Sequence, residues 1–227
     1  MIDIHQHVTA DLAGQLGRAE RAGVERVVLL STSVHPEVAR TMHEVRTELT
    51  ALRGVLAGEG APDFTARRAH TELVAALGAT DGTLAMRKVE LSAPYEQVLE
   101  TVAWAVREPR FVGLGELTPA AGAGASIEPV VRASAEASVG APLPVLAHGF
   151  APNGLEDLRA YAEVARRHPT VPVVIGAFGG LHAVAAIELA MACPNLYLDL
   201  SSALQVFLVG VALQEIPEQC LFGSNTP

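Results

Sequence analysis

Two histidines separated by a single residue, His5 and His7, stand in the N-terminal run IDIHQH. Alternate residues of a β-strand project from the same face, so in a strand both imidazoles would point the same way. Paired imidazoles are a common beginning of a site for a divalent transition metal. The alternative is a pair of hydrogen-bonded polar side chains at the mouth of a barrel, and a motif this short does not decide between the two.

Three further polar residues end apolar runs later in the chain: Glu116 in FVGLGEL, His148 in PVLAHGF and Asn225 in CLFGSNTP. The active sites of parallel α/β barrels form at the C-terminal ends of their strands. A glutamate and a histidine that reach this rim from separate strands would supply oxygen and nitrogen ligands suited to Zn²⁺, Mn²⁺ or Fe²⁺. Alternatively, Glu116 caps a turn and His148 bonds a backbone carbonyl. The convergence of several such residues favours the metal site.

Short β-rich runs alternate with amphipathic helical runs along the chain. We expect strands at 1–7, 24–31, 83–91, 111–117, 144–148, 171–176, 195–200 and 220–224, and helices at 11–22, 36–56, 63–77, 95–107, 127–139, 154–168, 181–192 and 203–215. This alternation indicates an α/β protein with a parallel sheet, closed or doubly wound. The run Gly113-Leu114-Gly115 lacks the third glycine of a dinucleotide-binding loop, which weakens a nucleotide-binding interpretation. We expect residues 1–227 to form a single barrel domain.

Composition narrows the class of protein further. Half of the 227 residues are hydrophobic and only 4% are aromatic, so the core must consist of Ala, Val, Leu and Ile, as in strands buried on both faces. The net charge is −9, Lys88 is the only lysine and no basic run occurs, which argues against nucleic-acid and membrane partners. Cys193 and Cys220 lie in apolar surroundings typical of buried, reduced thiols. Met1 leads directly into IDIHQH without a signal peptide, so a cytoplasmic location is expected.

The strand-end segments together resemble the metal-dependent amidohydrolase superfamily, and in particular its branch of decarboxylases and small-molecule hydrolases. The segments are IDIHQH, VGLGEL, PVLAHG, VPVVIGAFGG, NLYLDLSS and LFGSNTP, in the order of the family and over nearly the whole chain. The resemblance implies a (β/α)₈ TIM barrel with one or two divalent ions, zinc first and manganese or iron as alternatives. It also implies metal ligands at His5, His7, Glu116 and His148.

Two positions depart from the family pattern. The strand-six signature usually reads GHxGG, but here Ala177 replaces the histidine; the strand-eight signature usually reads GSDxP, but here Asn225 replaces the aspartate. In the family that aspartate binds metal and accepts the proton of the attacking water. The amide of an asparagine is neutral and cannot act as a base near neutral pH. Removing a general base typically lowers a rate by about 10²–10⁴-fold, so the hydrolytic machinery looks impaired.

The sequence therefore predicts a metal-dependent enzyme, a hydrolase or a lyase, that acts on a small acidic or cyclic organic molecule. With the two departures, a reaction that needs only Lewis-acid polarisation, such as decarboxylation, elimination, cyclisation or isomerisation, is favoured over hydrolysis. His148 and Asn225 are the candidate catalytic residues, and His35 could contact the substrate. The alternative is a catalytically inactive barrel, natural or engineered, that binds a ligand or a partner.

The sequence reaches Pro227 directly after the last expected strand, with no eighth helix. In such barrels each helix covers the outside of two neighbouring strands. The outer faces of the first and last strands, with Ile2 or Ile4 beside Leu221, would then expose an apolar strip. We expect either further C-terminal residues that this sequence omits, or a homodimer that buries the strip.

Overall fold

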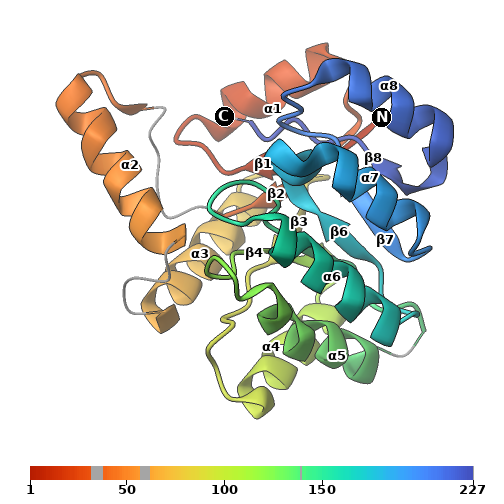
Figure 1. Cartoon of the computed structure of the whole chain (residues 1–227). Coiled ribbons are helices and arrows are strands. Elements are labelled where there is room, and N and C mark those ends of the chain that lie inside the picture. The colour runs from red at the N-terminus through yellow and green to blue at the C-terminus, as the bar shows by residue number, and fades with distance from the viewer. Residues whose placement is uncertain (32–37, 57–61, 139, 227) are drawn as a thin grey trace.

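A computed structural model describes residues 1–31, 38–56, 62–138 and 140–226. Eight parallel strands form one sheet in chain order, curled into a barrel (Figure 1). The strands are β1 (Ile2–His7), β2 (Arg26–Leu30), β3 (Leu84–Arg87), β4 (Phe111–Leu117), β5 (Val145–Ala147), β6 (Val173–Ile175), β7 (Leu196–Asp199) and β8 (Cys220–Leu221).

The segment that follows β8 closes the barrel against β1. The backbone N–H of Ile4 donates to the carbonyl of Phe222 at 3.0 Å, and the N–H of Asn225 donates to the carbonyl of His5 at 2.8 Å. A third bond joins the N–H of His7 to the carbonyl of Thr226 at 2.7 Å. The predicted (β/α)₈ TIM barrel is therefore confirmed, and the closure places Asn225 beside the first-strand histidines.

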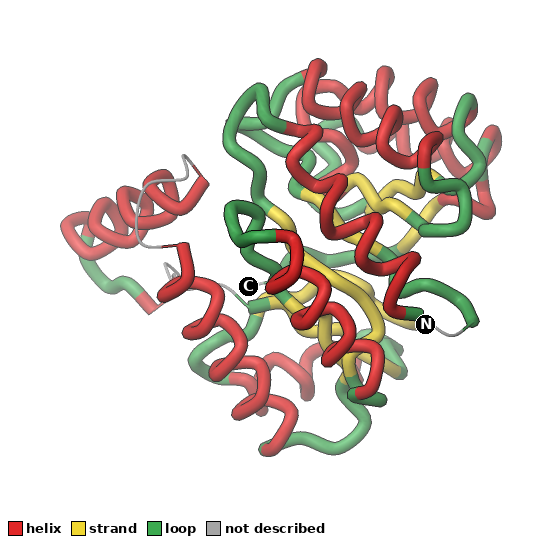
Figure 2. The backbone as a smooth tube through the Cα atoms, turned by 90° about the horizontal axis from the view of Figure 1, so that it is seen from below, coloured by secondary structure: helices red, strands yellow, loops and turns green. Residues whose placement is uncertain are grey.

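Helices lie outside the strands on the described part of the chain (Figure 2). They are α1 (Leu12–Arg21), α2 (Met42–Leu56), α3 (Pro62–Gly78), α4 (Tyr95–Arg107), α5 (Glu128–Ala137), α6 (Leu155–Arg167), α7 (Ala183–Met191) and α8 (Val206–Glu215), with short 3₁₀ helices η2 (Gly124–Ile127), η3 (Gly176–His182) and η4 (Pro217–Gln219). As predicted, no helix follows β8 in the described residues. None of the described helices has the length and hydrophobicity needed to cross a membrane.

One helix boundary differs from the expectation. Helix α2 was predicted to begin at Pro36, which lies outside the described residues, but it begins at Met42. A reciprocal capping pair explains the later start: the N–H of Glu44 donates to Oγ1 of Thr41 at 3.2 Å, and the N–H of Thr41 donates to the Glu44 carboxylate at 3.0 Å. Helix α2 projects away from the barrel and leaves Met42 exposed (Figure 1).

The inside of the barrel has an apolar floor and a polar mouth. The floor is a cluster of buried side chains on the inner faces of four strands, namely Val28, Leu30, Met86, Leu146 and Val174. Because side chains alternate along a strand, the residue two positions after a floor residue faces the same way. His148 follows Leu146 in this manner, and Lys88 follows Met86, so both lie toward the C-terminal mouth where barrel active sites form.

The expectation for the outside of β1 and β8 needs one correction. Leu221 was predicted to face outward, but it packs against the floor cluster inside the barrel. A register shift by one residue reverses the face of every side chain in a strand, and the outward residue here is Phe222. Phe222 is 42% exposed and Ile2 is 50% exposed, so apolar surface does face outward at this seam.

Candidate metal centre

The two imidazoles of β1 meet at the mouth of the barrel. His5 Nε2 and His7 Nε2 lie 3.2 Å apart, and both side chains come from the inner face of the strand, as the spacing of two residues predicted. His5 is almost fully buried, with 1% of its side chain exposed, whereas 17% of the His7 side chain is exposed. The pair is therefore open to the mouth only on the His7 side.

Glu116, on β4, completes a group of three possible ligands. One of its carboxylate oxygens, Oε2, lies 3.9 Å from Nε2 of His5 and 3.9 Å from Nε2 of His7. The ligand atoms of these three residues all lie within 4.8 Å of one another. Gly176 lies beside the carboxylate, and a Cβ there would contact Oε1 of Glu116 at 3.4 Å and crowd the carbonyl oxygen of Ala147 at 3.0 Å.

A buried carboxylate at the end of β7, Asp199, fixes the orientation of His5. Its Oδ2 accepts hydrogen bonds from Nδ1 of His5 and from the hydroxyl of Ser201, both at 2.7 Å, and its Oδ1 accepts one from the N–H of Ser201 at 3.0 Å. A carboxylate that holds the proton on Nδ1 leaves Nε2 free as a ligand, which is the usual support for a metal-binding histidine. Gly223 is required here, because a Cβ at that position would collide with Asp199 Oδ1 and lie 2.9 Å from the Cβ of His5.

The charges of the group shift its pKa values in opposite directions. Burial disfavours the cationic form of His5, but the hydrogen bond to Asp199 and the charge of Glu116 outweigh it and raise the pKa of His5. Burial and the neighbouring charge of His5 lower the pKa of His7 to about 4. Burial disfavours the charged form of Glu116 as well, but His148, His5 and His7 hold its pKa far below the usual range. At neutral pH the group thus contains an ionised carboxylate and a neutral imidazole at His7.

These residues fit a divalent cation. Asp199 holds one proton of His5 on Nδ1, and the other ring nitrogen, Nε2, lies at hydrogen-bond distance, 3.2 Å, from Nε2 of His7, so a cation bound there would take the place of the proton between the two rings. Two imidazole nitrogens that are each about 2.0–2.1 Å from a tetrahedral ion lie roughly 3.3 Å apart. Nδ1 of His7 is buried and has no hydrogen-bond partner among the described residues. Nitrogen and carboxylate donors of this kind suit Zn²⁺, Mn²⁺ and Fe²⁺.

His148 reaches the same rim, at the end of β5, but contacts the group through Glu116. Its Nδ1 lies 2.8 Å from Oε1 of Glu116, and its Nε2 lies 3.3 Å from the carbonyl oxygen of Ala151. Burial lowers the pKa of His148, but the charge and hydrogen bond of Glu116 outweigh burial and raise it. His148 is outside the set of three whose ligand atoms lie within 4.8 Å.

The two departures from the family pattern both border this group. Asn225 raises the pKa of His7 against the effect of burial, and its Nδ2 donates to the hydroxyl of Ser202 at 2.8 Å. Ala177 places no ligand atom in the site, but its backbone N–H donates to Oδ2 of Asp199 at 3.1 Å. The structure therefore uses the backbone of Ala177 to hold Asp199, while its side chain contributes only a buried methyl group.

Sequence reasoning brought the right strand ends together but missed two residues. Asp199 was not among the predicted ligands, although its place at the end of an apolar strand was a signal for a contact with His5. Lys88 was noticed only as the sole lysine, although it stands at the end of β3. His35, the candidate substrate contact, lies outside the described residues.

The fold matches solved structures of enzymes. One is a 2,6-dihydroxybenzoate decarboxylase complexed with 2,6-dihydroxybenzoate. It matches with a TM-score of 0.55 and is 13% identical over 99% of this chain and 86% of that one. A 5-carboxyvanillate decarboxylase from Novosphingobium aromaticivorans, complexed with manganese and 4-hydroxy-3-methoxy-5-nitrobenzoic acid, has a TM-score of 0.56 and 13% identity over 93% of this chain and 69% of that one. An amidohydrolase from Burkholderia multivorans with bound zinc has a TM-score of 0.61 and 15% identity over 99% and 83%.

At these identities the likeness is one of fold. The barrel fold of these decarboxylases and of this amidohydrolase is the fold that the predicted resemblance implied. Comparison with models of protein families gives no match, and comparison with curated proteins gives none either.

Proposed function

We propose that this protein is a metal-dependent enzyme of the amidohydrolase superfamily that acts on a small organic molecule. The observation that carries the proposal is the pair of Nε2 atoms 3.2 Å apart, with a Glu116 oxygen 3.9 Å from each. His5, His7 and Glu116 would hold the ion, and it would act as a Lewis acid on a substrate oxygen. Three of the structural neighbours are decarboxylases or hydrolases whose structures contain a substrate-like acid or a metal, which supports the same assignment.

Decarboxylation, a lyase reaction, suits the described residues better than hydrolysis. Hydrolysis needs a base for the attacking water, and the amide of Asn225 cannot be one. The carboxylates at the mouth are already engaged. Asp199 accepts bonds from His5, Ala177 and Ser201, and Glu116 accepts one from His148. A reaction that starts with the loss of CO₂ needs a proton donor instead of a base.

His148 is the proposed proton donor. When an aromatic acid loses CO₂, the carbon that lost it must take up a proton in its place. Glu116 raises the pKa of His148, so its imidazole retains a proton nearer to neutral pH than a free histidine does. Because Nδ1 faces Glu116, the transferable proton would be the one on Nε2, which lies at the part-exposed side of the ring.

Metal content and CO₂ release test the proposal together. The protein is loaded with Zn²⁺ or Mn²⁺, freed of excess ion, and compared with His7→Gln and with His43→Gln, an exposed histidine of α2 that serves as the matched control. Wild type and His43→Gln should retain stoichiometric metal, whereas His7→Gln should lose most of it. Release of CO₂ is assayed with hydroxybenzoates that carry one carboxyl group and with hydroxybenzoates that carry two, and turnover of either should require both the metal and His148. Metal retained without any turnover would instead favour the inactive barrel.

A further inference from the structure

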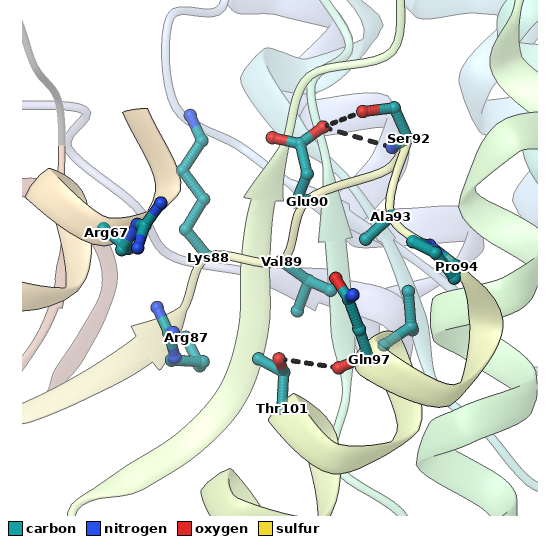
Figure 3. A pocket seen from close by; sticks show the side chains of 11 residues that line it. Arg67, Arg87, Lys88, Val89, Glu90, Ser92, Ala93, Pro94, Gln97 and Thr101 are labelled. Carbon is teal, nitrogen blue, oxygen red and sulfur yellow. Dashed lines mark hydrogen bonds between the residues drawn. The ribbon is translucent and has the colours of Figure 1, made fainter. Parts of the chain in front are cut away.

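Several basic side chains gather at the end of β3. A cavity of 340 Å³ opens between the β3–α4 loop and helices α3 and α4 (Figure 3). Its lining includes three basic side chains, Arg67, Arg87 and Lys88, and one carboxylate, Glu90. In a protein with a net charge of −9, such a concentration of positive charge is an exception. The volume is in the range of pockets that hold small molecules.

Glu90, the carboxylate among the described lining residues, is partly engaged by its own loop. Glu90 accepts hydrogen bonds from the backbone N–H and the hydroxyl of Ser92, at 3.1 and 2.8 Å. These bonds direct one of its oxygens toward the loop, as the dashed lines in Figure 3 show. Arg87 and Lys88 thus share the cavity with one partly engaged carboxylate, which favours an anion as its occupant.

Arg87 carries buried donors that the described residues do not satisfy. Its Nε and Nη1 atoms are buried and have no hydrogen-bond partner, and burial lowers its pKa to about 10. Its guanidinium lies 5.9 Å from the centre of the Trp104 ring, so one face is covered by an aromatic side chain. Buried donors without partners are rare and call for an explanation such as a bound ligand. A carboxylate can accept two hydrogen bonds from one guanidinium.

Lys88 connects this cavity with the metal centre. It follows Met86 by two residues and so lies on the inner side of β3, in the mouth of the barrel. Burial lowers its pKa, while the charges of Glu116 and Glu90 raise it, and the charge of Lys88 in turn lowers the pKa of His7. The same ammonium group thus acts on a candidate metal ligand and lines the cationic cavity. In Figure 3 it extends from the strand end alongside the carboxylate of Glu90.

We propose that this cavity binds a carboxylate group that the substrate keeps throughout the reaction, with Lys88 as its main contact. The proposal rests on the proposed function, because it takes the metal centre next to Lys88 as the place of reaction. The proposed substrate is then a small organic anion with a reacting group at one end and a carboxylate at the other. Its reacting end lies at His5, His7 and Glu116, and its charged end lies at the β3–α4 loop.

The only lysine of the chain provides a direct test that does not depend on activity. Protein labelled with ¹³C at the ε-carbon of lysine gives one signal, from Lys88, which is followed during titration with benzoate and with neutral benzamide. Benzoate should shift the signal and raise the pKa of Lys88, and benzamide should do neither. Lys88→Met should weaken benzoate binding, measured by calorimetry, by roughly tenfold or more, since a charged hydrogen bond is lost. Lys88→Arg should restore most of the binding.

The matched control is Arg159→Met, because Arg159 is an exposed cation on α6 paired with Glu156 and distant in sequence from this loop. Benzoate affinity in that variant should equal that of the wild type. An unchanged Lys88 signal, or equal benzoate affinity in the wild type and Lys88→Met, overturns the pocket assignment. The titration is run on metal-free and zinc-loaded protein. If benzoate shifts Lys88 but zinc does not bind, the proposed metal enzyme fails and the anion pocket stands. If zinc binds but benzoate does not, the pocket alone fails.

Discussion

Replacing Asp199 with asparagine tests how the protein holds His5. The carboxylate accepts three hydrogen bonds at Oδ2, from His5 at 2.7 Å, the N–H of Ala177 at 3.1 Å and the hydroxyl of Ser201 at 2.7 Å. Its other oxygen, Oδ1, accepts the N–H of Ser201 at 3.0 Å. An asparagine side chain has only one accepting oxygen. If that oxygen takes the place of Oδ2, the amide NH₂ faces the N–H of Ser201, and one buried donor loses its partner.

The expected loss has two measurable parts. An unsatisfied buried donor costs about 1–3 kcal/mol, so Asp199→Asn should lower the free energy of unfolding of the metal-free protein by that amount. Loss of the carboxylate behind a metal-binding histidine typically weakens metal affinity by about 10–100-fold. Zinc affinity should therefore fall by roughly 1.4–2.8 kcal/mol in addition to the change in stability.

Two assays separate these parts. Denaturant unfolding of the metal-free protein gives the change in stability, and competition with a chromogenic chelator at neutral pH gives the change in zinc affinity. Asp81→Asn is the control, because Asp81 is an exposed acid in the turn before β3. It should change neither quantity. A folded Asp199→Asn variant that binds zinc as tightly as the wild type would show that the Asp199–His5 bond does not support a metal ligand.

Three further predictions concern the rest of the site and the seam of the barrel. Asn225→Asp together with Ala177→His should raise zinc occupancy and any hydrolytic activity above the wild type by supplying the missing ligand and base, and equal, stoichiometric metal in both proteins would contradict this. The pKa of His7 in the folded state is lowered from 6.5 to about 4, so between these pH values only the unfolded state takes up this proton. Acidification from neutral pH to about 5 should therefore lower the free energy of unfolding of the metal-free wild type by about 2 kcal/mol more than that of His7→Asn. An equal loss of stability in the two proteins would refute the assignment. A second copy of the chain should cover the exposed apolar seam at Ile2 and Phe222, so light scattering should find a dimer that Phe222→Ser converts to monomer, whereas a monomeric wild type would exclude this role.

The strand-end residues could be predicted because they depend on local rules. The spacing of His5 and His7 fixes their common face, and the C-terminal rim of a parallel barrel gathers Glu116 and His148. The sequence does not reveal the register of neighbouring strands, that is, how far each strand extends toward the mouth of the barrel relative to the next. That register places Glu116 between His148 and the β1 pair, so His148 contacts the group through a carboxylate.

Side-chain contacts and strand ends that the hydrophobic pattern does not reveal account for what was missed. The bond between His5 and Asp199 joins residues 194 positions apart, and no local pattern identifies such a partner. The third strand was predicted to continue to Leu91 but ends at Arg87, so Lys88 was taken for a residue within a strand when it stands at the mouth of the barrel. The later start of α2 depended on the reciprocal cap between Thr41 and Glu44, which a hydrophobic period does not reveal.

The central claim is that His5, His7 and Glu116 bind one divalent ion together. Anomalous diffraction from crystals of the zinc-loaded protein, recorded on both sides of the zinc absorption edge, tests it most directly. We predict a zinc peak between the two Nε2 atoms, at about 2.0–2.1 Å from each and within about 2.2 Å of a Glu116 oxygen. Zinc found only elsewhere on the protein, or absent from zinc-loaded crystals while the Nε2 atoms of His5 and His7 remain in direct contact, would contradict the account.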